Sequence, residues 1–333
     1  MGDNERETAR RTFLASAGWT GAEILLLPPD ASFRRYFRIH EDGRAAMLMD
    51  APPQENVRAF VQVAEHLTAL GLRVPQVYSH DLQSGFGLLE DLGDDTFTRL
   101  LAAGSDERIL YRRAVEVLGV LQTHPQATNI DVPRYDSALL VDEVLRLIDW
   151  YYPDVRGEAA PAGIRREFAD LWHAIFAALP PLAPTLVLRD YHVDNLISVE
   201  AADGTTQCGL LDFQDAVIGS PAYDLMSLLE DARRDVPCAL VEEMKQHYHH
   251  VVQTADRHAF ELHFHALAAQ RHCKVLGNFA RLCRRDGKCA YLAHIPRVVG
   301  LLQRHLSTPL LQPLQRWLDT HLPMRHEAQV SPN

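Results

Sequence analysis

Two short polar segments, each beside an apolar stretch, carry the residue types that phosphoryl transfer requires. Asp190 and Asn195 stand five residues apart, directly before the apolar residues 196–199, and Asp212 follows the apolar residues 209–211. One carboxylate can orient an attacking hydroxyl and take its proton, while an amide oxygen and a second carboxylate can hold Mg²⁺ on a nucleotide. Either segment alone is more often a turn or a helix N-cap. The prediction of phosphoryl transfer therefore depends on finding both, in this order.

A third segment, Gly219-Ser220-Pro221-Ala222-Tyr223-Asp224-Leu225, follows a few residues later. Together the three segments resemble the catalytic loop, the metal motif and the G-x-P-x-x-D-L segment of the aminoglycoside phosphotransferase and choline kinase superfamily. The resemblance implies that Asp190 is the catalytic aspartate and His192 the loop histidine. It also implies that Asn195 and Asp212 bind the metal and that Asp224 supports the catalytic loop. ATP and Mg²⁺ are the cofactors that this superfamily implies.

The front of the chain departs from the kinase pattern. A typical kinase holds the nucleotide phosphates with a strand lysine, but Met47-Leu48-Met49 occupies that strand here, and the chain's lysines all lie in its second half: Lys245, Lys274 and Lys288. We expect Arg34 or Arg35, together with Ser32 and backbone amides, to take over phosphate binding, because the arginine fork suits phosphate. The alternative is that both arginines are surface charges on a strand.

Residues 87–93 resemble the hinge that joins the two lobes in the superfamily. Backbone groups usually read adenine there. Glu90 and Leu92 are therefore named as nucleotide-binding residues for their position alone.

The main candidate for substrate contacts is a helical stretch rich in amides and cations, residues 270–281. Positions 270, 274, 278 and 281 are three or four residues apart and share a helix face. Either this face lines the substrate site, or it is the polar face of a helix that packs in the core. The candidate contacts are His192, Asp215, Gln270, Arg271, Lys274, Asn278 and Arg281.

Longer phrases, such as DASFRRYFRI, LRDYHVDNL, DLMSLLEDARRDV and KVLGNFARLCRRDGK, are similar to the bacterial cell-wall amino-sugar kinases. That resemblance covers about residues 10 to 310. It implies ATP-dependent phosphorylation of the anomeric hydroxyl of N-acetylmuramate and N-acetylglucosamine during peptidoglycan recycling. Arg271 or Arg281 would then meet the lactyl carboxylate. Two alternatives are a kinase of another small hydroxyl substrate (an aminoglycoside, a choline-like alcohol or homoserine) and a nucleotide-binding regulatory protein without catalysis.

The elements that must position these residues change in character along the chain. Apolar patterning and turn signals predict a helix over 6–19, strands over 24–27, 33–39 and 45–49, a helix from Asn56 to Gly71, and strands at 77–78 and 87–89. Helical patterns then cover 100–123, 138–152, 164–179 and the region after 221, with short strands at 186–188, 196–199 and 209–211. We expect an α+β, two-lobed protein-kinase-like fold with a small β-rich N-lobe over 1–92 and a larger, mainly helical C-lobe over 93–333.

Composition excludes several classes of function. The net charge of −11 argues against a general nucleic-acid binder. No apolar run approaches the ~20 residues needed to cross a bilayer, and the charged start has no signal core. The five cysteines contain no CxxC pair and suggest neither a disulfide frame nor a zinc site, and the histidines around 247–265 are expected on helix faces rather than on a metal. We expect a cytoplasmic monomer without membrane or nucleic-acid partners.

Overall fold

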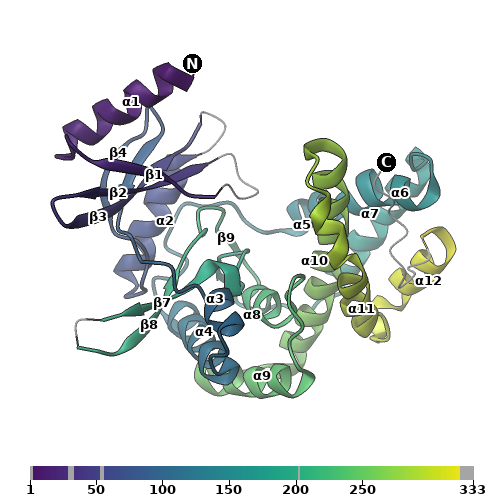
Figure 1. Ribbon diagram of the computed structural model, residues 1–333. Coiled ribbons are helices and arrows are strands. Elements are labelled where there is room, and N and C mark those ends of the chain that lie inside the picture. Colours follow the sequence, from purple (N-terminus) through teal and green to yellow (C-terminus); the bar gives the residue numbers. More distant parts are fainter. Residues whose placement is uncertain (1–2, 29–33, 53–55, 202, 323–333) are drawn as a thin grey trace. The chain divides into compact units, whose positions relative to one another are not determined.

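The computed structural model describes residues 3–28, 34–52, 56–201 and 203–322. The chain divides into two compact units (Figure 1). The first unit contains Met1–Ile130 and Val193–Ala216, and the second contains Asp131–His192 and Val217–Asn333. The 190–195 segment therefore changes unit between His192 and Val193.

The first unit is built on an antiparallel sheet, which its described residues form in the order β1-β2-β3-β5-β4. Its strands are β1 (Glu23–Leu26), β2 (Arg35–Glu41), β3 (Arg44–Asp50), β4 (Val77–Asp81) and β5 (Phe86–Leu89). Alternate residues of a strand point to the same face, and on one face this alternation buries Ile39 of β2, Leu48 of β3 and Phe86 of β5. Helix α1 (Asp3–Ser16) covers them with Phe13 and Leu14.

Helix α2 (Val57–Ala69) begins where the sequence predicts, because the Asn56 side chain accepts a hydrogen bond from the Ala59 amide. The single helix expected over 100–123 is wrong. The chain forms α3 (Phe97–Ala102) and α4 (Glu107–Thr123), since Gly104 adopts a positive φ of 88° and Asp106 caps a new helix. The unit is completed by a 3₁₀ turn η2 (Val193–Asn195) and the hairpin β7 (Leu196–Glu200) and β8 (Thr206–Leu210).

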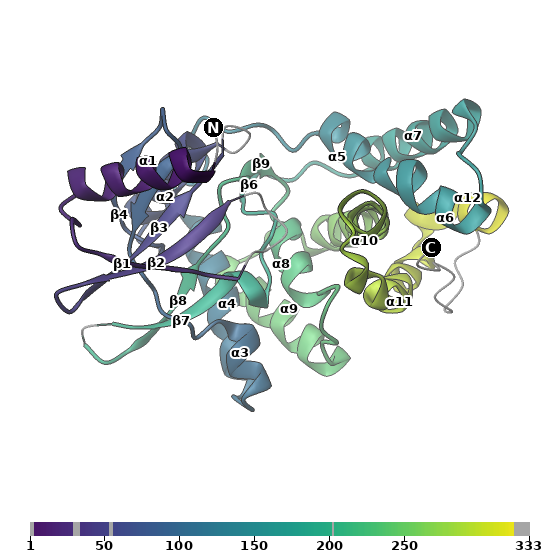
Figure 2. The same cartoon turned by 45° about the horizontal axis from the view of Figure 1, so that its top comes forward.

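The second unit is mainly helical (Figure 2). Its elements are α5 (Ser137–Val144), a π-helical turn η1 (Leu147–Tyr151), α6 (Tyr152–Arg156), α7 (Ala162–Ala177), β6 (Thr185–Val187), β9 (Val217–Gly219), α8 (Ala222–Leu229), α9 (Cys238–Val252), α10 (Arg257–Asp286), η3 (Cys289–His294), α11 (Ile295–Leu306), η4 (Pro309–Leu311) and α12 (Gln312–His321). The continuous helix predicted over 138–152 is therefore interrupted by η1. Strand β9 was not predicted, and it pairs with β6 beside the catalytic-loop segment.

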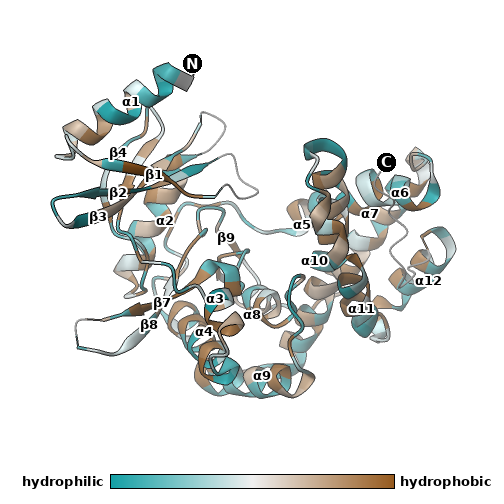
Figure 3. Ribbon diagram, in the orientation of Figure 1, coloured by the Kyte–Doolittle hydropathy of each residue, from teal (hydrophilic) through white to brown (hydrophobic). Residues whose placement is uncertain are grey.

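Helix α10 runs through the core of the second unit and lies beside α11 in both views (Figures 1 and 2). Its middle is buried and mixes apolar side chains with polar ones, whereas its C-terminal end, with Arg284, Arg285 and Asp286, is hydrophilic (Figure 3). Gly277 lets η1 approach, because a Cβ there would lie 2.2 Å from the Arg146 carbonyl. The small antiparallel N-terminal sheet and the mainly helical C-terminal region confirm the expected fold class. The lobe boundary at residue 92 stays a prediction, since the two compact units divide the chain differently.

One interpretation of the cysteines is wrong. Cys283, near the end of α10, and Cys289, at the start of η3, form a disulfide. The turn at Gly287 brings them together six residues apart, a spacing that the search for CxxC did not consider. Within the described residues, no helix combines the length and the apolar character needed to span a membrane.

Candidate functional site

The two predicted metal ligands meet in the first unit. Asn195 ends η2 and Asp212 follows β8, and the Asn195 amide nitrogen lies 3.5 Å from Asp212 Oδ2. The hairpin β7–β8 sets this distance, because Leu196 pairs directly with Leu210. Gln214 steadies the other oxygen, donating to Asp212 Oδ1 at 2.8 Å. An amide oxygen and an exposed carboxylate are the oxygen ligands that Mg²⁺ prefers, so the donor set fits that ion.

Arg34 and Arg35, which the sequence left as equal candidates, differ in their surroundings. Arg34 is buried, and its guanidinium lies 3.6 Å from Asp212 Oδ1. Arg35 is exposed at the start of β2. The geometry therefore favours Arg34 as the cation beside a bound nucleotide. Ser32 lies outside the described residues.

The predicted hinge residues have structural contacts of their own. The Glu90 carboxylate receives two hydrogen bonds from Arg73, at 2.6 and 2.7 Å, and the Arg73 hydrogen bond lowers the pKa of Glu90. The Glu90 amide donates to the Gln76 carbonyl at 2.8 Å. Leu92 is half-buried and approaches Gly209 of β8. These contacts brace the segment, and a role in adenine binding stays a prediction for both residues.

The segment around Asp190 belongs to the second unit and is held by Asp224. The Asp224 carboxylate is fully buried and accepts the backbone amides of Leu188 at 2.7 Å and Arg189 at 2.9 Å. Burial raises its pKa to about 7, against the opposing effect of the two amides. Arg189 adopts a φ of 71°, a left-handed conformation that is costly for a residue other than glycine. These contacts are those that a loop-supporting role for Asp224 requires.

Asp190 faces a cation from α10. The Arg271 guanidinium lies 3.6 Å from Asp190 Oδ1, and its other arm donates to the Arg189 carbonyl and the Tyr223 hydroxyl, both at 3.2 Å. Desolvation acts to raise the pKa of the Asp190 carboxyl, but the charges of Arg271 and Lys274 outweigh it and lower the pKa to about 2. Asp190 is therefore ionised at neutral pH, ready to accept a hydrogen bond from a hydroxyl.

Behind Arg271 lies a buried polar network that sequence reasoning missed. Its centre is Glu143 of α5, which is 1% exposed and binds Arg189, Tyr135 and Lys274. Burial works to raise the pKa of Glu143, yet Lys274 and Arg189 lower it to about 2. The Lys274 ammonium lies 2.9 Å from Glu143. No signal near Glu143 in the sequence indicates this network, since Arg189 and Lys274 lie far from Glu143 in the chain.

The residues of α10 that were predicted to contact the substrate mostly bond to other parts of the protein. Gln270 is fully buried and donates to the Leu140 carbonyl at 3.0 Å, and Lys274 binds Glu143, so neither contact favours a sugar. The Asn278 amide oxygen accepts from Arg146 at 3.2 Å. Arg281 is half-buried, and burial lowers its pKa.

The two candidate contacts outside α10 lie on different units. His192 is buried in the second unit. Asp215 is exposed in the first unit and accepts from Gln214 at 3.4 Å. Their roles in substrate binding stay predictions.

Two of the histidines predicted on helix faces make ordinary hydrogen bonds. His263 bonds to the Pro180 carbonyl at 2.8 Å, and His249 to Thr254 at 3.0 Å. A different pair, His272 and His305, directs both Nε2 atoms at the buried Glu230 carboxylate, at 2.6 and 2.8 Å. Because these hydrogen bonds satisfy the carboxylate, we interpret the trio as a packing network between α8, α10 and α11.

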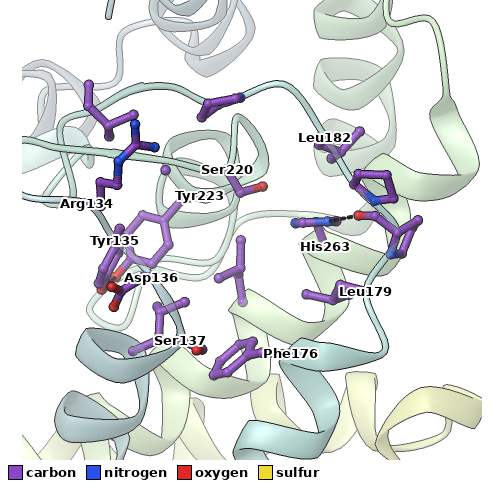
Figure 4. Close-up of a pocket in the computed structure, with 17 residues that line it drawn as sticks. Arg134, Tyr135, Asp136, Ser137, Phe176, Leu179, Leu182, Ser220, Tyr223 and His263 are labelled. Atoms are coloured by element: carbon purple, nitrogen blue, oxygen red, sulfur yellow. Dashed lines mark hydrogen bonds between the residues drawn. The ribbon is translucent and has the colours of Figure 1, made fainter.

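The second unit also contains a cavity of about 360 Å³ (Figure 4). Phe176 and Leu179 form part of its apolar lining, and Arg134, Asp136 and Ser220 add polar groups. None of the residues lining it is among those that the sequence predicts for the reaction. We assign it no part in the chemistry.

Comparison with known proteins gives a consistent result. Residues 23–263 match the model of the phosphotransferase enzyme family. A protein of Caulobacter vibrioides named N-acetylmuramate/N-acetylglucosamine kinase is 35% identical, over 96% of this chain and 98% of its own. A Pseudomonas aeruginosa protein of the same name is 37% identical, over 85% of this chain and 83% of its own.

Solved structures share the fold at lower identity. An ADP-bound aminoglycoside phosphotransferase, APH(2'')-Ib, has a TM-score of 0.59 at 14% identity, covering 91% of this chain and 97% of that one. A microcompartment-associated aminopropanol kinase has a TM-score of 0.61 at 14% identity, covering 88% and 94%. At such identities the likeness establishes the fold alone.

Proposed function

The chain belongs to the phosphotransferase enzyme family, and we propose that it transfers phosphate from ATP to the anomeric hydroxyl of N-acetylmuramate and N-acetylglucosamine. The observation that carries the proposal is the similarity, over nearly the whole chain, to kinases named for these two sugars. The chemistry of the described residues agrees with it, since each residue type that the reaction needs is present and suitably held.

Asp190 is proposed to orient the sugar hydroxyl. With a pKa of about 2 the carboxylate is a weak base, so its main task is to accept the hydrogen bond that aims the oxygen at the γ-phosphorus. The new bond forms between this oxygen and phosphorus, the bond to the β–γ bridging oxygen breaks, and ADP leaves. The hydroxyl proton passes late to Asp190 and then to solvent.

Asn195 and Asp212 would hold Mg²⁺, which, when bound, neutralises charge on the β- and γ-phosphates. Arg34, beside Asp212, is proposed to replace the front-lobe lysine as a phosphate contact. Catalysis in this scheme is mainly positioning and charge stabilisation.

The product would be a sugar 1-phosphate, the form that enters nucleotide-sugar synthesis, and we propose that the reaction serves peptidoglycan recycling. We propose that the protein works as a cytoplasmic monomer without nucleic-acid or membrane partners. Its net charge of −11 supports the absence of a general nucleic-acid partner.

The test is to incubate the pure protein with Mg²⁺-ATP and, separately, N-acetylmuramate, N-acetylglucosamine and kanamycin, and to identify products by phosphorus NMR and mass spectrometry. An anomeric phosphate from the two amino sugars is expected. A phosphate at another sugar position, or turnover of kanamycin alone, would contradict the proposal. ATP binding without transfer to any acceptor would favour a regulatory protein.

The variant Asp190→Asn should lower kcat by about 10²–10⁴-fold while ATP binding persists, because it removes the carboxylate that positions the hydroxyl. Asp194→Asn is the matched control, since this nearby acid bonds to Thr98 and an amide oxygen can still accept that bond. Equal activity of Asp190→Asn and wild type would remove Asp190 from the mechanism.

A further inference from the structure

The turn that follows β8 fixes the surroundings of Asp212, the proposed metal ligand. Phe213 is buried and stacks on Phe60 of α2, with ring centroids 5.0 Å apart, so the turn is anchored in the core of the first unit. The Leu211 amide donates to the Asn195 carbonyl at 2.9 Å. Asp212 adopts a φ of 55°, a conformation that is costly for a residue other than glycine and persists only where its neighbours enforce it. The backbone around this carboxylate is therefore held in one place.

The side chain of Gln214 lies between two carboxylates. It is 7% exposed, and its Nε2 donates to Asp212 Oδ1 at 2.8 Å and, over a longer distance of 3.4 Å, to Asp215 Oδ2. An ionised carboxylate only accepts hydrogen bonds, so the amide nitrogen, and not the amide oxygen, must face both acids. The amide oxygen of Gln214 has no hydrogen-bond partner among the described residues. The two carboxylates therefore set the orientation of the Gln214 amide.

The contacts of Asp212 divide between its two oxygens. Gln214 and the Arg34 guanidinium both approach Oδ1, at 2.8 and 3.6 Å, whereas the Asn195 amide approaches Oδ2 at 3.5 Å. A metal ion shared by Asp212 and Asn195 would therefore meet Oδ2. Mg²⁺ demands near-octahedral geometry with few protein ligands, whereas the larger Ca²⁺ often takes both oxygens of one carboxylate. The engaged Oδ1 thus matters for which of the two ions fits.

We propose that Gln214 is a positioning residue that makes Asp212 a one-oxygen ligand and so favours Mg²⁺ over Ca²⁺ in the nucleotide site. A carboxylate whose second oxygen already accepts a hydrogen bond must give up that bond before it can chelate a larger ion. Asp215 then acts through Gln214, by fixing the amide, and does not contact the sugar. The inference rests on the part of the proposed function in which Asp212 binds Mg²⁺.

The experiment measures metal affinity without any sugar. Free Mn²⁺ is followed by electron paramagnetic resonance, with the protein in slight excess over a non-hydrolysable ATP analogue, and Mg²⁺ and Ca²⁺ are titrated as competitors. Gln214→Met keeps the length of the side chain but removes the donor. Its affinity for Mg²⁺ should fall about ten- to hundredfold, and its affinity for Ca²⁺ should fall less. An unchanged Mg²⁺ affinity, or an equal loss for both ions, would overturn the proposal.

Gln207→Met is the matched control. Gln207 is exposed on β8, in the hairpin that leads to Asp212, so this variant should keep the wild-type affinity for both ions. The same loss in both variants would assign the effect to the hairpin and not to Gln214. A misfolded fraction lowers the number of binding sites per protein but leaves the affinity of the remaining sites unaltered, so the titration separates positioning from folding.

Two variants test Asp215. Asp215→Asn keeps an oxygen that can accept from Gln214 and should retain the wild-type Mg²⁺ affinity. Asp215→Ala removes that oxygen and should lower the affinity about two- to tenfold. Both variants should keep the wild-type KM for N-acetylglucosamine. A raised sugar KM with unchanged metal affinity in Asp215→Ala would make Asp215 a substrate contact and overturn its role beside Gln214.

The two proposals fail in different ways. If wild type phosphorylates the amino sugars and Gln214→Met binds both ions as wild type does, only the role of Gln214 is overturned. If wild type transfers no phosphate to either sugar but Gln214→Met shows the narrowed metal preference, the proposed acceptor is wrong and the role of Gln214 stands. If wild type binds no Mn²⁺ beside the nucleotide, the metal site and the role of Gln214 are both wrong.

Discussion

At the scale of single residues, the most informative contact is that between Arg271 and Asp190. The sequence suggested that Arg271 meets a substrate carboxylate, but the structure places its guanidinium 3.6 Å from Asp190 and bonds it to the Arg189 carbonyl. A cation at this distance does two things. It holds the carboxylate in its ionised form, and it fixes where the carboxylate points. Arg271 is thus a positioning residue in the proposed reaction.

This assignment predicts the behaviour of Arg271→Met. Lys274, His192 and Arg189 remain near Asp190, but loss of the cation with the largest effect on its carboxyl should raise the pKa of that carboxyl. The acidic limb of the kcat/KM profile should therefore move to higher pH, because activity needs the ionised form. We also expect kcat at pH 7 to fall about ten- to hundredfold from misplacement of the carboxylate.

The pH–rate profile, measured from pH 4 to 9, checks this prediction. With a pKa of about 2 for Asp190 the wild-type limb lies below this range, and the limb of Arg271→Met should rise into it. Arg271→Lys keeps the charge and should show no such limb, even if kcat falls. An Arg271→Met profile without an acidic limb above pH 4 would restrict Arg271 to a purely structural role.

The residue scale also shows what spacing can and cannot predict. The Asp190, Asn195 and Asp212 motif was readable because each residue follows or precedes an apolar strand at a characteristic separation. Glu143 was not readable, since its importance comes from burial and from partners far away in the chain. The choice between Arg34 and Arg35 likewise needed the structure, because neighbouring residues of an extended segment point in opposite directions.

At the scale of elements, local signals predicted the strands of the first unit to within three residues at each end, and Asn56 was correctly identified as a cap. The failures have physical reasons. The break between α3 and α4 was missed because the apolar residues on both sides of Gly104 were read as one helix, although Gly104-Ser105-Asp106 carries a turn residue and a helix cap. The apolar pattern continues through η1, so it did not reveal the π-helical turn that packs against α10. Strand β9 has three residues, too few for a period to appear.

The close packing of α10 on η1 leads to a prediction for Gly277→Ala. Its Cβ would lie 2.2 Å from the Arg146 carbonyl carbon and oxygen, which are backbone atoms and cannot rotate away. Two elements must separate to admit it, so we expect a loss of unfolding free energy of about 1–3 kcal/mol.

Gly300→Ala on α11 is the matched control, measured in the same urea titrations. Nothing lies within 4 Å of a Cβ built there, and alanine favours a helix over glycine by about 0.8–1.0 kcal/mol. This variant should be slightly more stable than wild type. A Gly277→Ala protein as stable as wild type would show that the contact between α10 and η1 is not tight.

At the scale of the whole molecule, buried carboxylates decide how stability depends on pH. The folded protein holds the pKa of Glu143 at about 2 and also lowers that of Glu230, in each case because nearby cations or hydrogen bonds outweigh burial. Both values lie below the ordinary 4.5. Asp224 acts in the opposite sense, since burial raises its pKa from 3.8 to about 7.

The directions of these pKa shifts determine how the free energy of unfolding changes with pH. Each lowered carboxylate stabilises the fold above pH 4.5 and loses that contribution as pH falls toward its folded pKa, at about 1.4 kcal/mol per pH unit. Asp224 stabilises the fold fully only below 3.8, and this contribution is lost as pH rises toward 7. Asp190 and Glu261, each with a pKa of about 2, act in the same sense as Glu143 and Glu230, so the lowered carboxylates outnumber Asp224. Below pH 3.8 the contribution of Asp224 no longer changes. The free energy of unfolding should therefore fall steeply between pH 4.5 and 3.

Urea titrations at half-unit steps from pH 7 to pH 3 measure this slope, with Glu143→Gln as the decisive variant. The amide cannot titrate, so the slope below pH 4.5 should be shallower by about 1.4 kcal/mol per pH unit, whatever the change in absolute stability. Glu200→Gln, at an exposed site on β7, should keep the wild-type slope. If Glu143→Gln also keeps it, then Glu143 is not held ionised by Lys274 and Arg189, and the network behind Asp190 does not carry the charges assigned to it.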